Sequence, residues 1–229
     1  MKTIGIIGGL SWYSTAQYYK IINEQMNHRL GGSSSAKLLI YSLDFSEFSA
    51  LQKSGDWSTI AGMLIDIARR LISAGADAIL IASNTPHMIA DQLAAAIDKP
   101  LIHIAEETAK VIEKMEIRRV GLLGTKFTME QTFFKEKLGH RNIEAITPDL
   151  HDRNMIHDTI FNELSCGIYT EGTRQYYLNI IDQLKSRDIQ GIIFGCSEIC
   201  LLIDPLSLGI PVFDTTQIHA VSAVQYALK

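Results

Sequence analysis

The chain has 229 residues, of which 47% are hydrophobic and 20% charged, and its formal net charge is −4 at pH 7. This composition is ordinary for a globular protein, and the length suits one large domain or two small ones. The small negative charge gives no basic footprint for nucleic acid or for an anionic membrane, so we expect a small-molecule partner. No stretch approaches the roughly 18 apolar residues of a membrane span, and no signal peptide opens the chain, so we expect a cytoplasmic protein.

Short β-rich runs alternate along the chain with longer amphipathic segments. The runs are rich in Ile, Leu and Val and end in polar residues or glycine, which is typical of buried strands. The predicted strands are residues 3–9, 36–44, 78–83, 100–105, 119–124, 191–196 and 210–215, and the predicted helices are residues 14–30, 60–76, 107–116, 176–187 and 218–229. This alternation predicts parallel sheets covered by helices.

Three segments recur later in the chain in the same order. "TIGIIGG" is echoed by "RVGLLGT" 116 residues later, "ILIASNT" by "IIFGCSE" at a shift of 113, and "KPLIHIAEET" by "IPVFDTTQIH" at a shift of 111. One pair alone carries little weight, because buried strands resemble one another. Together they predict an α/β fold of two pseudo-symmetric Rossmann-like domains with parallel sheets. We expect the first domain to hold residues 1–100 with the segment 213–229, and the second to hold residues 101–212.

The matched strand ends differ in the residue that they deliver. The run at 78–83 ends in Ser83, whereas the run at 191–196 ends in Cys196. Ligands of open parallel sheets bind beyond the carboxyl ends of the strands, so we expect an active site in an interdomain cleft, with Ser83 and Cys196 on opposite walls. Cys196 could instead be a small core residue, but its place at the matched end, before two polar residues, favours a catalytic thiol.

The other two cysteines, Cys166 and Cys200, are predicted to have structural roles. The chain has three cysteines and no secretory signal, which argues against a disulfide framework and for free thiols. Cys200 follows Cys196 by one helical turn, between apolar neighbours, and is interpreted as a core residue, and Cys166 is interpreted as structural. We expect no metal site, because no closely spaced set of ligands accompanies the thiols and His87 or His103.

Polar residues just beyond the two matched strands are candidates for substrate contact. Asn84 and Thr85 follow Ser83, and Ser197 and Glu198 follow Cys196. Strand-to-helix turns of this kind present N–H groups that can hold a carboxylate. Such groups can also lower the pKa of a thiol from about 8.5 into the working range of a base.

Several further candidates have two interpretations each. Thr125 and Thr128 follow the run at 119–124 and could donate hydrogen bonds to a carboxylate, or could cap a helix. Ser83 itself could be only a helix N-cap. Trp12 could be a core aromatic or a lid over the site. His87 is interpreted as a first-turn supporting residue rather than as an acid.

Taken in order, five motifs resemble those of one enzyme family. They are "IGIIGGLSW", "SNTPH", "LLGT" followed by Thr128, "GCSE" and "PVFDT". This combination resembles the PLP-independent aspartate/glutamate racemase superfamily and, within it, the aspartate racemase branch with its CNT and GCTE motifs. More closely, the chain is similar to a subgroup specific for L-aspartate and L-glutamate in which the first cysteine is absent and threonine replaces it.

The resemblance implies a cofactor-independent racemase for aspartate or glutamate that forms a homodimer. One side chain removes the α-hydrogen from one face of the substrate and another returns a proton to the opposite face. The implied catalytic residues are Cys196 and Ser83. Ser11, Trp12 and Gln52 are implied as additional substrate-binding residues.

The chain departs from the family pattern at two positions. Phe48 and Thr170 stand where typical aspartate racemases carry basic residues that bind the distal carboxylate, and Gln52 is a neutral donor nearby.

Four alternatives to a natural two-base racemase are open. Ser83 could be an engineered replacement for a cysteine of the natural chain. A decarboxylase of the same superfamily keeps only the second cysteine, whereas a maleate isomerase needs a cysteine at the first site, which Ser83 argues against. A protein that only senses a dicarboxylate would use the same cleft without chemistry.

Overall fold

The computed structural model describes residues 1–229, which divide into two compact units. Unit 1 comprises Met1–Ile104 and His219–Lys229, and unit 2 comprises Ala105–Ile218. Helices α5 (Ile104–Lys114) and α11 (Thr215–Ala227) contain the two boundaries. None of the helices combines the length and the hydrophobicity that a membrane span requires.

Unit 1 is built around a four-stranded parallel sheet with the order β2-β1-β3-β4. Its strands are β1 (Ile4–Gly8), β2 (Leu38–Ser42), β3 (Ala78–Ile81) and β4 (Leu101–Ile102). Its other elements are α1 (Trp12–Leu30), α2 (Phe45–Ser54), α3 (Trp57–Ser73), the 3₁₀ helix η1 (Thr85–Ile89) and α4 (Ala90–Ala95).

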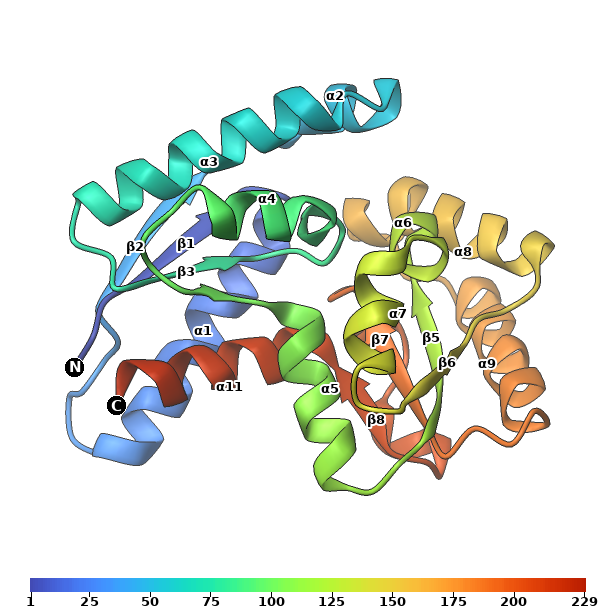
Figure 1. Ribbon diagram of the computed structural model, residues 1–229. Helices are drawn as coiled ribbons and strands as arrows, with labels where there is room; N and C mark the ends of the chain where they lie inside the picture. Colours follow the sequence, from blue (N-terminus) through green and yellow to red (C-terminus); the bar gives the residue numbers. More distant parts are fainter. The chain divides into compact units, whose positions relative to one another are not determined.

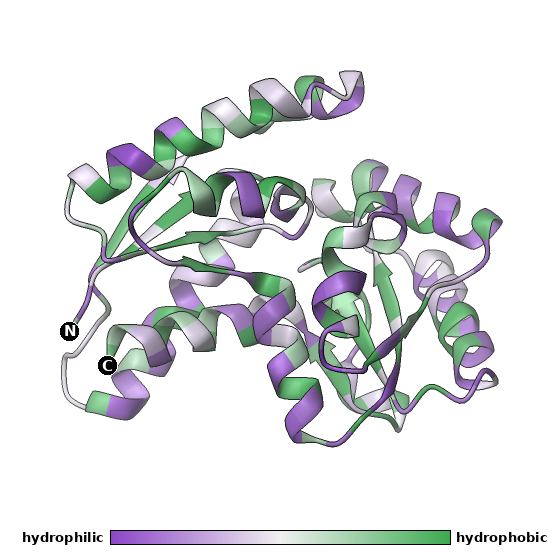
Figure 2. Cartoon of the chain, in the orientation of Figure 1, coloured by the Kyte–Doolittle hydropathy of each residue, from purple (hydrophilic) through white to green (hydrophobic).

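Both faces of this sheet are covered, as Figure 1 shows for unit 1. Alternate residues of the central strands supply the two cores: Ile6 and Leu80 pack with α1 and α11, whereas Ile7 and Ile81 pack with α2, α3 and α4. Because a strand between two helical layers has no solvent face, β1 and β3 are hydrophobic throughout, which is visible in Figure 2.

The sequence of α3 explains its position. Asp56 caps its first turn by accepting the N–H of Thr59 at 3.0 Å. Ile60, Leu64 and Ile67 recur at helical spacing and are all buried. A helix with one apolar stripe gains most of its stability by burying that stripe, here against the sheet.

Unit 2 repeats the arrangement with the strand order β6-β5-β7-β8, again all parallel. Its strands are β5 (Arg119–Gly124), β6 (Glu144–Ile146), β7 (Gly191–Gly195) and β8 (Val212–Asp214). Its other elements are α6 (Lys126–Glu130), α7 (Thr132–Gly139), α8 (Leu150–Asn162), the 3₁₀ helix η2 (Leu164–Cys166), α9 (Glu171–Lys185), α10 (Ile199–Leu202) and the 3₁₀ helix η3 (Pro205–Leu208).

The two units confirm the predicted fold class of two parallel α/β domains. The three recurring segments fall on the strand pairs β1 and β5, β3 and β7, and β4 and β8. Each pair occupies the same position in its own sheet, so β3 and β7 are topological equivalents. The core of unit 2 lies between β5, β7, α8 and α9 and includes Phe194 and Tyr177.

Several elements were missed in the sequence. Strand β6 has only three residues and begins with a charged side chain, so no apolar run marks it. Helix α8 is rich in polar residues, and its core contacts rest on Ile156 and Ile160. Helices α2, α4, α6, α7 and α10 have ten residues or fewer, too few for a clear helical period.

The predicted domain boundaries misplace strand β4 and divide strand β8. The boundary after residue 100 places β4 in the second domain, and the boundary at 213 divides β8. In the structure β4 pairs with β3 in unit 1, and β8 pairs with β7 in unit 2. Each sheet keeps its own edge strand because backbone pairing joins them, which apolar patterning alone does not reveal.

Candidate active site

Ser83 lies two residues beyond β3 and is partly exposed. Its N–H donates to the carbonyl of Ile81 at 2.8 Å, which folds the chain back at the strand end. The hydroxyl of Ser14, in the first turn of α1, donates to the carbonyl of Ala82 at 3.0 Å. The Ser83 hydroxyl makes no hydrogen bond within unit 1 and caps no helix, so the N-cap interpretation is wrong.

The buried ring of His87 contacts the backbone of Ser83. Its Nδ1 lies 2.9 Å from the carbonyl oxygen of Ser83, and its Nε2 accepts the N–H of Ile104 at 3.3 Å. This pattern requires the neutral ring with the proton on Nδ1. Burial, followed by the nearby ring of His219, lowers the pKa of His87 to about 3. His87 is therefore a neutral supporting residue in the first turn of η1, as the sequence predicts.

A second buried imidazole continues this network within unit 1. The hydroxyl of Tyr18 lies 2.9 Å from Nδ1 of His219, and Nε2 of His219 lies 2.7 Å from the carbonyl oxygen of Ile102. The ring centroids of His219 and His87 are 5.6 Å apart, and burial lowers the pKa of His219 to about 3. Sequence reasoning missed this pair, because Tyr18 and His219 are separated by 201 residues.

The other predicted substrate-binding residues of unit 1 differ in their surroundings. Ser11 is the N-cap of α1, and its φ of 109° is unusual for a residue other than glycine. Asn84 and Thr85 are buried beside Ser83, and Gln52 is buried on α2. Trp12 is 63% exposed, so its interpretation as a core aromatic is wrong.

The turn after β1 requires its glycines. A Cβ on Gly8 would lie 2.6 Å from the methyl carbon of Thr15. Gly9 adopts a φ of +78°, and a Cβ there would lie 2.1 Å from the backbone oxygen of Leu43. Thr15 also accepts the N–H of Gly9 at 2.8 Å through its hydroxyl. Unit 2 repeats this contact, because a Cβ on Gly124 would lie 3.1 Å from Cβ of Thr128.

Cys196 immediately follows β7 and is half-buried. Its thiol donates to Oε2 of Glu198 at 3.0 Å, and the hydroxyl of Ser197 donates to the same oxygen at 2.7 Å. Thr215, the first residue of α11, donates to the carbonyl of Phe194 at 2.9 Å and so holds the end of β7. The carboxylate of Glu198 thus faces the thiol.

The environment of Cys196 keeps it protonated. Burial raises the pKa of the Cys196 thiol well above its ordinary value, and the negative charge of Glu198 raises it further. The backbone N–H of Glu198 opposes this by bonding the sulfur. The sequence led us to expect a thiol pKa lowered by N–H groups. That expectation is wrong, because burial and a neighbouring carboxylate outweigh a single N–H.

Thr125 and Thr128 have clear structural roles. Thr125 is the N-cap of α6 and accepts the N–H of Thr128 at 3.3 Å, so the capping interpretation holds for it. The methyl carbon of Thr128 lies 2.9 Å from the position of a Cβ on Gly195, the residue before Cys196. Gly195 therefore leaves room for Thr128 to pack against the end of β7.

The other two thiols differ from Cys196 in their surroundings. Cys200 packs against the core of unit 2 and bonds the carboxylate of Asp214, which agrees with its interpretation as a core residue. Cys166 is exposed at the end of η2. Phe48 and Thr170 stand at the two positions where typical aspartate racemases carry basic residues. Phe48 is buried in a core of unit 1, and Thr170 is the N-cap of α9.

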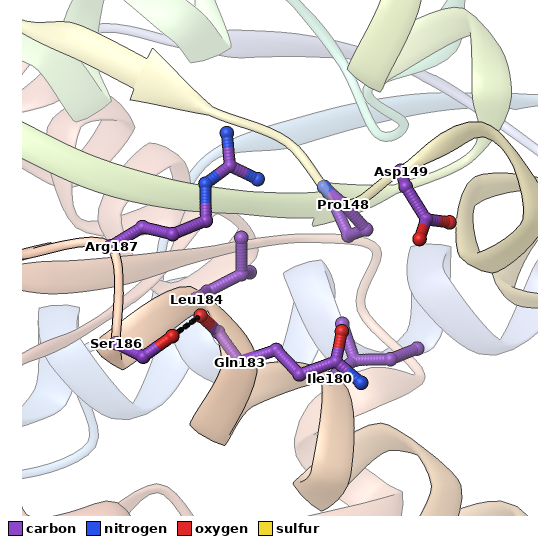
Figure 3. Close-up of a pocket in the computed structure, with 7 residues that line it drawn as sticks. All are labelled: Pro148, Asp149, Ile180, Gln183, Leu184, Ser186 and Arg187. Carbon is purple, nitrogen blue, oxygen red and sulfur yellow. Dashed lines mark hydrogen bonds between the residues drawn. The ribbon is translucent and has the colours of Figure 1, made fainter.

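A surface pocket in unit 2 lies away from these residues. Figure 3 shows Gln183 of α9 and Arg187, just beyond that helix, opposite Pro148 and Asp149, which precede α8. Arg187 donates to the carbonyl of Thr147 at 3.0 Å, and Asp149 is the N-cap of α8. Its Ser186 hydroxyl donates to the carbonyl of Gln183 at 2.6 Å. Because these polar groups serve the fold and no cysteine lines the pocket, it is not the candidate site.

Several known proteins are similar to this chain in sequence and in fold. The model of the Asp/Glu/hydantoin racemase family matches residues 7–223. A broad-specificity amino-acid racemase of Bacillus subtilis (strain 168) is 25% identical over 228 residues, with 96% of each chain covered. Among solved structures, a candidate Asp/Glu racemase from Yersinia pestis is 47% identical, with a TM-score of 0.94 and full coverage of both chains.

A second solved structure, an aspartate racemase homologue from Pyrococcus horikoshii OT3, is 33% identical, with a TM-score of 0.87 and full coverage of both chains. The family match therefore extends over most of the chain, and both units take part in it. The chain belongs to the Asp/Glu/hydantoin racemase family and is a racemase by enzyme class.

Proposed function

We propose that the protein racemises an acidic amino acid, aspartate or glutamate, without a cofactor. The observation that carries the proposal is the equivalence of β3 and β7, which lead to Ser83 and Cys196 just beyond their ends in two units of the same topology. Racemisation needs one proton-transferring group on each face of the α-carbon, and a duplicated fold supplies two such groups. The proposal requires that both act on a single substrate.

The two groups differ in strength. The Cys196 thiol ionises far more readily than a hydroxyl, so it is the stronger base of the two. The resemblance to the aspartate racemases implies that this base removes the α-hydrogen of the L-enantiomer. The Ser83 hydroxyl, free of hydrogen bonds within unit 1, returns a proton to the opposite face, directly or through water. The backbone N–H groups beside Ser197 and Asn84 hold the α-carboxylate as negative charge develops on the carbon.

The substrate class rests on two supports. The relatives from Yersinia pestis and Pyrococcus horikoshii OT3 are named for aspartate or glutamate racemisation. Within this chain, Gln52 is buried at 5% exposure and offers a neutral amide donor for the distal carboxylate. A homodimer remains a prediction from the resemblance, and a cytoplasmic location remains a prediction from the sequence.

A single-cysteine decarboxylase is the second candidate. The observation in its favour is that only one of the two equivalent strand ends carries a thiol, since Ser83 occupies in unit 1 the position that Cys196 occupies in unit 2. Such an enzyme protonates a carbanion from one side only and needs no second base.

Solvent exchange separates these functions. Purified protein is incubated in deuterium oxide with L- and D-aspartate, L- and D-glutamate, a neutral amino acid and an arylmalonate. The α-hydrogen is followed by proton NMR, and the enantiomers are separated by chiral chromatography. We expect exchange and racemisation of an acidic amino acid. Release of carbon dioxide from the malonate without exchange would favour the decarboxylase, and binding without any reaction would favour a sensor.

A further inference from the structure

The two equivalent strand ends differ in how far their sheets hold them. The pairing of β3 with β1 ends at Ile81, two residues before Ser83, and one further backbone bond joins Ala82 to β1. The pairing of β7 with β5 continues to Gly195, the residue next to Cys196. Strand pairing therefore fixes the chain directly up to Cys196, whereas Ser83 lies beyond the ladder of its own sheet.

A buried side chain takes the place of the ladder at Ser83. Nδ1 of His87 lies 2.9 Å from the Ser83 carbonyl oxygen, and Nε2 accepts the N–H of Ile104 at 3.3 Å. The ring thus ties Ser83 to the first residue of α5. His87 is 1% exposed, and its ring packs against that of His219, with the two centroids 5.6 Å apart. Both ring nitrogens and a ring face are therefore in contact, which fixes the imidazole in one orientation.

The reach of the Ser83 hydroxyl depends on this backbone contact. The hydroxyl makes no hydrogen bond within unit 1, so only the backbone position and the rotation about one side-chain bond decide where it lies. Proton transfer needs the two heavy atoms at hydrogen-bond distance, and a misplacement of about 1 Å can cost about 100-fold in rate. The contact with His87 therefore bears on the rate at which Ser83 can act.

We propose that His87 is a positioning residue for proton return by Ser83 and has no comparable effect on proton removal by Cys196. This inference rests on the proposed function. His87 itself gains and loses no proton. The Ser83 hydroxyl, or a water that it holds, gives its proton to the α-carbon, whose electron pair forms the new C–H bond. The electron pair of the broken O–H bond stays on oxygen, which then takes a proton from solvent.

Two rates measured on one sample separate the two faces of the substrate. An L-substrate that loses its α-hydrogen to Cys196 and regains deuterium from the same thiol exchanges without inversion, whereas racemisation also needs Ser83. L-aspartate and L-glutamate are incubated in deuterium oxide, with exchange followed by proton NMR and inversion by chiral chromatography. The ratio of racemisation to exchange is independent of how much protein is folded, so a merely structural loss leaves it unchanged.

Two amide replacements of His87 divide its contacts. In His87→Gln the side-chain oxygen stands near the position of Nε2 and can accept the Ile104 N–H, but the donor to Ser83 is lost. In His87→Asn the amide nitrogen stands near Nδ1 and keeps the contact with Ser83. We expect the ratio to fall about 10-fold in His87→Gln and to stay within about 2-fold of the wild-type value in His87→Asn.

Thr215→Val is the matched control in unit 2. It removes a fully buried hydroxyl that donates to the carbonyl of Phe194, near Cys196. The ladder of β5 and β7 already fixes the chain there, so the ratio should not change. An unchanged ratio in His87→Gln, or an equal fall in Thr215→Val, would overturn the inference. Exchange without any racemisation in the wild-type protein would overturn it as well, because Ser83 would then return no proton.

A second readout needs no substrate. Amide hydrogen exchange followed by peptide mass spectrometry should be faster in His87→Gln for residues 81–86 and unchanged for residues 194–199, because only the first segment loses a contact. Equal protection of residues 81–86 in the variant and the wild-type protein would overturn positioning by His87. Absence of α-hydrogen exchange in the wild-type protein with every substrate would instead overturn the proposed function.

Discussion

The ends of β3 and β7 occupy equivalent positions in two similar sheets, yet their surroundings are opposite in character. Behind Ser83 lie the neutral imidazoles of His87 and His219, both bonded to backbone carbonyls. Around Cys196 lie the acidic groups Glu198 and Cys200. The comparison teaches that a duplicated fold fixes the positions of two equivalent strand-end residues, whereas the neighbouring side chains decide the environment of each.

Removal of the thiol should have the largest effect on activity. Cys196→Ala leaves no strong base on its face of the substrate, so exchange of L-substrates should fall by about 1,000-fold or more. The substitution removes one half-buried sulfur and should leave the fold intact, as circular dichroism can verify. Cys200→Ala is the matched control, because that thiol faces Asp214. Equal losses in both variants would contradict the assignment.

Restoring a thiol at the other strand end should sharpen the comparison. Ser83→Cys adds a group that can ionise near neutral pH, so exchange of the D-enantiomer should rise about 10-fold or more. L-substrates in the wild-type protein should exchange deuterium faster than they racemise, and this variant should narrow the gap. Chiral chromatography and proton NMR on the same samples measure both rates. Unchanged D-enantiomer rates would favour the single-cysteine decarboxylase.

The smallest effect concerns stability in acid. His87 and His219 stay neutral in the folded protein down to about pH 3, but unfolded histidines take up a proton near pH 6.5. The unfolded state therefore binds more protons between these values, and stability should fall as the pH drops below 6.5. Each imidazole contributes at most about 1.4 kcal/mol per pH unit.

Urea denaturation between pH 7.5 and pH 4.5 measures this slope. His87→Asn preserves a donor near the position of Nδ1, which bonds the Ser83 carbonyl, but it does not titrate. The variant should show a shallower loss of stability in acid than the wild-type protein. Parallel slopes would mean that His87 is protonated in the folded state.

The arrangement of the site was only partly visible in the sequence. The apolar runs ending at Ser83 and Cys196 could be matched because buried strands are local and continuous. The supporting contacts could not: Tyr18 reaches His219 and Thr215 reaches the Phe194 carbonyl across long stretches of chain. Such contacts depend on how helices pack against strands, and no local pattern records them.

The sequence by itself determined the two parallel α/β units, the pairing of their strands in the repeat, and the two polar strand ends. These features follow from alternating apolar runs and helical periods, which act over a few residues at a time. Only the tertiary structure decided the ionisation of the site. Burial and the carboxylate of Glu198 raise the pKa of Cys196, and burial lowers the pKa of His87 to about 3. A pKa depends on solvent exclusion and on charges brought near in space, and both arise only when the chain has folded.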